Sequence, residues 1–123
     1  MALAPCAYTI TFNVTHGKLN ALLNQRSQDM LVANNWNVVQ YSALVHAFAA
    51  ESGLRPGELV HVIADAHIYS RHIPIVYRLI HLEPLKPPRL EFDKAPFYEL
   101  TPENFDFPGY NYHEFTNKID VAI

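Results

Sequence analysis

Alternating side chains near the N-terminus constrain the fold more than any other feature of the sequence. Over residues 8–14, aromatic and aliphatic residues alternate with threonine and asparagine, which is typical of a half-buried strand. A turn over 15–18 contains a glycine, and residues 19–28 return as a second strand. The sequence therefore predicts a hairpin, and this hairpin brings the only cysteine, Cys6, close to Arg26.

The rest of the chain predicts a mixed α+β fold, with a β-sheet and helices packed on one side of it. A helix is expected over 38–52 with Asn37 as its N-cap, and a glycine ends it. We expect 123 residues to form a single domain, 1–123. The other expected elements are a loop over 30–36, a turn over 55–57, a strand over 59–69, a helix over 73–82, an edge strand over 89–92 and a final strand over 118–123.

Composition excludes several classes of protein. A net charge of −3 argues against a sequence-independent nucleic-acid binder, and no apolar run has membrane-spanning length. One cysteine excludes an intrachain disulfide framework and fits a reducing compartment, so a soluble, cytoplasmic protein is expected. The seven histidines lack the spacing of metal ligands, so no metal is predicted.

A dense polar run, Gln25 to Asp29, follows the second predicted strand. Arg26 offers a planar fork of donors suited to a phosphate, and Ser27 adds a hydroxyl. A cation near Cys6 stabilises the reactive thiolate, so the pair predicts an anion-binding nucleophile site. The alternatives are that Cys6 is a small buried hydrophobic residue and that the polar run is a structural hydrogen-bond network.

Two further positions have both a structural and a functional interpretation. His67 and Tyr69 lie two apart on a predicted strand, so their side chains share one face. They form either a polar sheet face or a pair that binds sugar hydroxyls. Asn37 taken alone is only a helix cap.

Several motifs together resemble one family. In order they are Leu3-Ala4-Pro5-Cys6, Gln25-Arg26-Ser27-x-Asp29, Trp36-Asn37-Val38-x-x-Tyr41, Gly57-Glu58-Leu59, Asp65-Ala66-His67-Ile68-Tyr69 and Val121-Ala122-Ile123. Their order and spacing resemble thymidylate synthase across essentially the whole chain, which corresponds to the C-terminal half of the family pattern. No single motif is specific alone.

The resemblance implies an enzyme that methylates dUMP to dTMP, with Cys6 as the nucleophile that adds to the uracil ring. Arg26 would hold the phosphate and polarise the thiol, and it is the second catalytic residue. The other residues implied in dUMP binding are Gln25, which orients the pocket, Ser27 at the phosphate, Asp29, Asn37 at the uracil edge, and His67 and Tyr69 at the deoxyribose hydroxyl.

The resemblance also implies methylenetetrahydrofolate as co-substrate and a homodimer formed through the open face of the sheet. Asp29 would meet the pterin, and Leu3 and the C-terminal Ala122 would pack over the bound ligands. Ala33 stands where the family has a small glycine on the folate side. The chain departs from the family pattern again at Ala7, where a histidine usually follows the cysteine.

The half of the family pattern that this chain does not match carries the glutamate that manages proton transfers. The resemblance therefore implies that full catalysis needs a separate N-terminal half. The alternative is a non-catalytic remnant that binds pyrimidine nucleotides or dimerises. A related pyrimidine hydroxymethylase is a third hypothesis, which Asn37 argues against because an acidic residue better suits cytosine.

Overall fold

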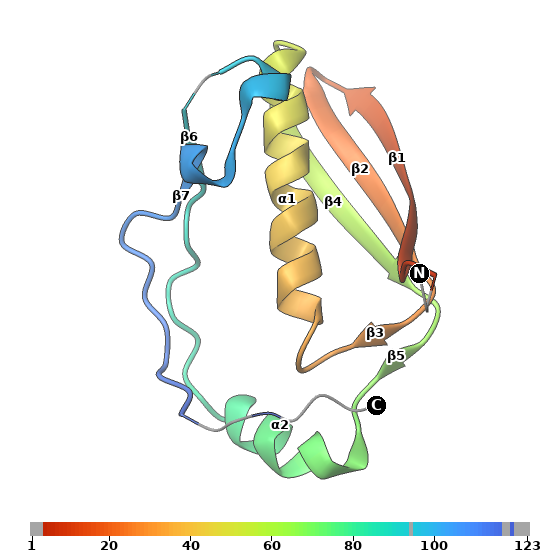
Figure 1. The fold of residues 1–123 in the computed structure, drawn as a ribbon, viewed down its shortest axis with the longest axis vertical. Helices are drawn as coiled ribbons and strands as arrows, with labels where there is room; N and C mark the ends of the chain where they lie inside the picture. The colour runs from red at the N-terminus through yellow and green to blue at the C-terminus, as the bar shows by residue number, and fades with distance from the viewer. Residues whose placement is uncertain (1–3, 94, 117–118, 120–123) are drawn as a thin grey trace.

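The computed structural model describes residues 4–93, 95–116 and 119. Its main sheet has the strand order β1-β2-β4, and α1 (Asn34–Glu51) packs against one face (Figure 1). β1 (Ala7–Thr15) and β2 (Lys18–Gln25) are antiparallel, whereas β4 (Arg55–Ile63) pairs with β2 in parallel. The predicted α+β fold with a mixed sheet is confirmed.

The predicted hairpin is formed by β1 and β2. Thr15 pairs with Lys18, so the turn consists of two residues, His16 and Gly17. Both have positive φ, 50° and 72°, the pair of left-handed conformations whose twist matches that of two adjoining strands. The backbone N–H of Arg55 donates to the Gly17 carbonyl (3.0 Å), which joins the turn to the start of β4.

The two long predicted strands each break in two. β2 ends at Gln25 and β4 at Ile63, after which the chain forms the short parallel pair β3 (Gln28–Asp29) and β5 (Ala66–His67). The Ala64 N–H still donates to the Gln25 carbonyl at the break (3.0 Å). Both strands bend at the same level, so β3 and β5 lie together beyond one end of the main sheet (Figure 1).

α1 begins four residues before its predicted start, so the assignment of Asn37 as the N-cap is wrong. Ala33 is the N-cap and makes no side-chain cap hydrogen bond. The preceding turn is closed instead by Asp29, whose Oδ1 accepts the N–H groups of Leu31 (3.0 Å) and Val32 (3.2 Å). This turn leads directly into the helix, so no cap is needed later in the sequence.

The C-terminal end of α1 is the one predicted, at Gly53. This glycine has a φ of 66°, and its N–H donates to the Ala50 carbonyl (3.2 Å). The N–H of Leu54 donates to the Ala49 carbonyl (2.7 Å), which completes a Schellman motif. β4 begins at the next residue, so the predicted turn over 55–57 is wrong.

The core lies between β2, the central strand, and the C-terminal half of α1. Phe48 of α1 extends it, because its ring packs against Phe12 of β1 (centroids 5.3 Å apart) and Phe97 (4.7 Å). The second contact ties the later part of the chain to the helix. The buried hydrophobic residues among those described are Leu19, Ala21, Leu23, Val45, Ala47 and Ala49.

The later part of the chain is short elements joined by extended segments. The predicted helix over 73–82 is α2 (Ile73–Leu79), which ends earlier. The predicted edge strand over 89–92 reduces to β6 (Glu91–Phe92), which pairs with β7 (Phe105–Asp106). The predicted final strand over 118–123 lies outside the described residues except for 119. The elements are 3₁₀ turns at Ser70–His72, Phe97–Glu99 and Pro102–Asn104, α2 (Ile73–Leu79), β6 (Glu91–Phe92) and β7 (Phe105–Asp106).

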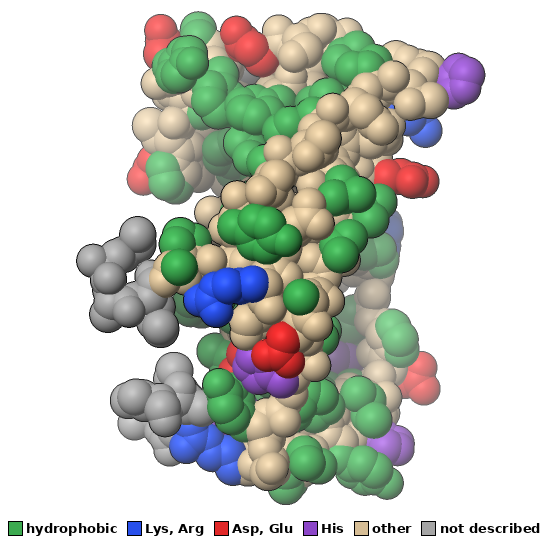
Figure 2. All heavy atoms as spheres, turned by 90° about the vertical axis from the view of Figure 1, so that its right-hand side faces the viewer, with side chains coloured by type: hydrophobic (Ala, Val, Ile, Leu, Met, Phe, Trp, Pro, Cys, Tyr) green, Lys and Arg blue, Asp and Glu red, His purple; other side chains and the backbone are tan. Residues whose placement is uncertain are grey.

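The face of the sheet opposite α1 carries exposed hydrophobic side chains. Leu22 of β2 and Val60 and Val62 of β4 lie on this face, and each is more than a third exposed. Figure 2 views the molecule from the side of β1 and shows hydrophobic side chains spread among polar ones. In the part of the chain that the structure describes, no helix is long and apolar enough to cross a membrane.

Candidate active site

Arg26 holds the loop that carries the thiol. Its backbone N–H donates to the Cys6 carbonyl (2.9 Å), as the predicted hairpin requires. Its guanidinium donates from Nη2 to the Ala4 carbonyl (2.7 Å) and from Nε to the Pro5 carbonyl (3.3 Å). Two of the five guanidinium N–H groups are used in this way, which leaves three for an anion. Cys6 is a free, exposed thiol, so the interpretation of it as a buried hydrophobic residue is wrong.

Gln25 is the polar centre of the site and is 2% exposed. Its Nε2 donates to the Ser27 carbonyl (2.9 Å) and to Oδ1 of Asn37 (3.3 Å). Its Oε1 lies 3.0 Å from Nε2 of His61. Asn37 therefore faces the sheet from the first turns of α1, and the structure brings it together with the polar run of residues 25–29.

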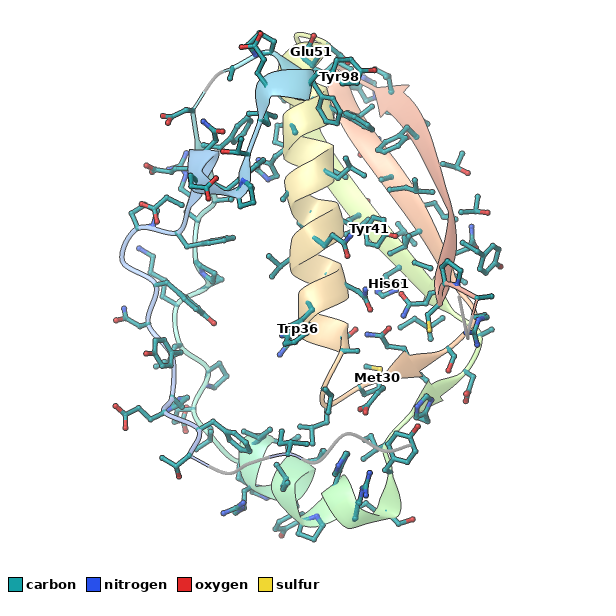
Figure 3. All side chains as sticks on the ribbon, viewed as in Figure 1. Met30, Trp36, Tyr41, Glu51, His61 and Tyr98 are labelled. Atoms are coloured by element: carbon teal, nitrogen blue, oxygen red, sulfur yellow. The ribbon has the colours of Figure 1, made fainter. Side chains whose placement is uncertain are left out.

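His61 was not among the predicted site residues. It lies on β4 opposite Leu23, on the face that α1 covers, and Figure 3 shows it between the helix and the sheet. Burial lowers the pKa of His61 below its ordinary value of 6.5. Alternation along the predicted strand, which places His61 on the same face as two aliphatic neighbours, was the available signal.

A carboxylate also enters the site, from Asp65 at the bend between β4 and β5. The Ser27 hydroxyl donates to its Oδ2 (3.5 Å), and Nδ1 of His67 lies 3.3 Å from the same oxygen. Ser27 must turn from this carboxylate to donate its proton to a phosphate. Asp65 appears in the sequence only as part of a motif, yet its carboxylate accepts the Ser27 hydroxyl and lies close to the ring of His67.

The rings of His67 and Tyr69 are in contact, although β5 ends at His67 and Tyr69 lies beyond the strand that was predicted to carry both. Their rings pack edge to face with centroids 5.1 Å apart, and Tyr69 makes a second edge-to-face contact with His72 (5.7 Å). His67 is partly buried, and Tyr69 is more exposed. The pair forms an aromatic and polar surface beside Asp65, below the end of the main sheet.

The predicted folate-side residues are only partly within the described chain. Asp29 uses Oδ1 to close the turn before α1, and its backbone carbonyl accepts the Ala33 N–H (3.1 Å). Its Oδ2 makes no hydrogen bond to any described residue. Leu3 and Ala122 lie outside the described residues. Within residues 4–93, 95–116 and 119, no group of three or more His, Cys, Asp or Glu side chains could hold a metal ion.

These features define a class of protein: an α+β chain in which an exposed thiol, a guanidinium and a buried amide network meet where the strands of a mixed sheet bend. Such a site is suited to an anion that carries a hydrogen-bonding ring. The thymidylate synthase family model matches residues 1–123. The chain therefore belongs to the thymidylate synthase family.

Relatives of known sequence and structure agree with this assignment. The chain is 37% identical to thymidylate synthase of Staphylococcus haemolyticus (92% of this chain, 36% of the relative) and 38% identical to that of Mycoplasma genitalium (94% and 40%). It is 38% identical to thymidylate synthase of human herpesvirus 8 (100% and 37%). The solved structure of thermostable thymidylate synthase A from Bacillus subtilis matches with a TM-score of 0.93 at 34% identity, over 100% of this chain and 45% of that one. The chain thus spans less than half the length of each.

Proposed function

We propose that this chain carries the nucleophile and most of the nucleotide site of a thymidylate synthase, which methylates dUMP to dTMP with methylenetetrahydrofolate. The observation that carries the proposal is the family match over every residue, combined with a single exposed thiol whose loop Arg26 holds through three backbone carbonyls. An exposed thiol can reach a bound ligand, and the guanidinium beside its loop can bind an anionic group of that ligand.

In the proposed reaction the Cys6 thiolate adds to C6 of the uracil ring, and the electron pair moves onto the C4 carbonyl as an enolate. C5 then attacks the methylene carbon of the folate, and one of the two bonds from that carbon to folate nitrogen breaks. Loss of the C5 proton and elimination of the folate leave an exocyclic methylene, which accepts a hydride from tetrahydrofolate as the thiolate leaves. The products are dTMP and dihydrofolate, so the methylene carbon is reduced while the folate is oxidised.

The dUMP phosphate would bind the three remaining N–H groups of Arg26, with Ser27 as a second donor. The uracil edge would meet the amide of Asn37, and His67 with Tyr69 would bind the deoxyribose hydroxyl. The distribution of charge supports this order, because the cation of Arg26 lies near the start of the polar run and the neutral amide of Asn37, on α1, is hydrogen-bonded to the buried Gln25. Gln25 has no hydrogen left for a ligand and acts by orienting its neighbours.

On the folate side, we propose that Asp29 contacts the pterin through its uncommitted Oδ2. Ala33 lies four residues further on, at the N-cap of α1, and would line the same side of the pocket. Leu3 and Ala122 are proposed to close over both ligands and exclude water.

We further propose that activity needs the remaining part of the family pattern, supplied as a separate N-terminal half, and a homodimer formed through the open sheet face. The exposed hydrophobic residues on β2 and β4 support an apolar interface there. Trp36 at 77% exposure and Tyr98 at 97% are further large side chains without cover among the described residues. We place this assembly in the cytoplasm.

The test is a titration of dUMP into this chain, alone and after mixing with the N-terminal segment of the Bacillus subtilis relative, with gel filtration of each sample. Binding of dUMP by the mixture, stronger than binding of deoxyuridine, supports the proposal. Binding without formation of dTMP in the presence of methylenetetrahydrofolate would identify a non-catalytic nucleotide-binding remnant. Dimerisation without any binding of dUMP would identify a dimerising one.

A further inference from the structure

His61, Gln25 and Asn37 form a chain of side chains that runs from β4 across β2 to α1. We infer that His61 is a positioning residue: through Gln25 it fixes the amide of Asn37 so that the site accepts a pyrimidine with a 4-keto group and rejects one with a 4-amino group. The inference rests on the proposed function and adds to it the residue that sets ring specificity. Figure 3 shows His61 on the inner side of β4, facing α1.

The orientation of the Gln25 amide follows from the Ser27 carbonyl. Nε2 of Gln25 lies 2.9 Å from that oxygen, which can only accept a hydrogen bond. The reversed amide would set two oxygens against each other, so the nitrogen must face Ser27. Oε1 of Gln25 then faces His61, and the distance from this oxygen to Nε2 of His61 is 3.0 Å.

The required state of His61 follows in turn. An oxygen at Oε1 needs a donor, so Nε2 of His61 must carry a proton. Burial lowers the pKa of His61, which favours the neutral ring, and the contact with Oε1 of Gln25 then places the ring's one proton on Nε2. The ring thus supplies a fixed donor to an amide that is 2% exposed and has no access to water as a substitute.

The last link is Asn37. The second N–H of Gln25 donates to Oδ1 of Asn37 (3.3 Å), so the Asn37 oxygen faces Gln25 and its Nδ2 faces away from Gln25, with no acceptor among the described residues. The amide therefore offers an Nδ2 donor and the second lone pair of Oδ1. These match the O4 acceptor and N3–H donor of uracil, whereas cytosine presents a donor and an acceptor in the opposite places.

Reversal of Asn37 would suit cytosine, and the chain of hydrogen bonds opposes it. A reversed Asn37 would put its NH₂ group against the N–H of Gln25, and Gln25 cannot reverse without opposing the Ser27 carbonyl. Loss of the His61 donor leaves Oε1 of Gln25 buried without a hydrogen bond. This destabilises the present orientation of the Gln25 amide, so the amide is held there less firmly. Ring specificity then weakens although no residue at the ring has changed.

The experiment compares dissociation constants for dUMP and dCMP in the mixture with the N-terminal segment. His61→Leu should lower the preference for dUMP by about tenfold, the scale of one buried hydrogen bond. His46→Leu is the matched control, a partly buried histidine on α1 outside this chain of contacts, and it should keep the wild-type ratio. His61→Gln, which can still donate to Gln25, should retain most of the preference. An unchanged ratio in His61→Leu overturns the inference.

Nitrogen NMR of the chain without nucleotide separates this inference from the proposed function. The wild type should show His61 with its proton on Nε2, and His61→Leu, but not His46→Leu, should shift the side-chain NH₂ signals of Asn37. A proton on Nδ1 with a bare Nε2, or unshifted Asn37 signals, overturns the inference even if dUMP binds. If neither nucleotide binds the wild type, the proposed function fails and the NMR result alone decides the positioning role. Should His61→Leu not fold, the proton position and His61→Gln decide.

Discussion

A bulge at Gly57 determines which side chains of β4 face α1. Leu19 pairs with Pro56 and Ala21 with Leu59, so two steps along β2 match three steps along β4. Because side chains alternate along a strand, one extra residue turns the rest of β4 over. Without the bulge, the side chain of His61 would face away from α1.

We predict that Gly57→Ala destabilises the chain. A Cβ at this position would lie 2.8 Å from the Leu19 carbonyl oxygen and would collide with the side chain of Asn20, whose Oδ1 accepts the Glu58 N–H (3.0 Å). Overpacking costs about 1–3 kcal/mol, and alanine recovers about 0.4–1 kcal/mol through the unfolded state. The free energy of unfolding should fall by ~1–2 kcal/mol, which for a chain of this length lowers Tm by roughly 4–8 °C.

Urea unfolding followed by circular dichroism measures this change. Asn20→Ala supplies the comparison, because it removes the side-chain collision and leaves the one with the Leu19 carbonyl. Gly57→Ala should therefore be less harmful in the Asn20→Ala background, but it should still destabilise. Equal stability of Gly57→Ala and wild type, with the pairing of β2 and β4 unchanged by NMR, would refute the reasoning.

Two more predictions concern charge. Arg26→Lys should shrink the preference for dUMP over deoxyuridine about tenfold in calorimetric titrations, since the three donors of an ammonium radiate from one nitrogen and do not reproduce the planar fork that reaches two loop carbonyls and a phosphate. An unchanged preference would remove Arg26 from the phosphate site. The pKa of His46 is lowered from 6.5 by burial, so the unfolded state binds its proton first as pH falls. The free energy of unfolding of wild type, relative to that of His46→Gln, should therefore be constant above pH 6.5 and decrease below it. Urea unfolding at pH 7 and at pH 5 measures this difference, and the same difference at both pH values would contradict a lowered pKa for His46.

The sequence predicted the parts of the fold that depend on local pattern. The hairpin follows from alternation and a glycine turn, and the end of α1 follows from Gly53. The start of α1 was missed because the turn that precedes it is closed by Asp29, a contact that no helix pattern contains. The break in the two long strands was missed because each strand alone reads as continuous, and the bend exists only in their pairing.

The candidate site was predicted in the same uneven way. The approach of Cys6 to Arg26 needed only the hairpin, and a backbone hydrogen bond of 2.9 Å joins the two residues. The contact between Gln25 and His61 depends on the parallel pairing of β2 with β4, which α1 connects, and on the bulge in β4. No local sequence pattern reveals either feature. The roles of Ser27 and Asn37 toward a ligand stay predictions.

The central claim is that Cys6 is the nucleophile of a thymidylate synthase site. Fluorodeoxyuridylate with methylenetetrahydrofolate traps such a nucleophile covalently, and intact mass spectrometry counts the adducts on a chain that has one cysteine. We predict one adduct when the N-terminal segment is present, none without it, and none for Cys6→Ser. An adduct that survives Cys6→Ser, or no adduct in a mixture that binds dUMP, would contradict the account.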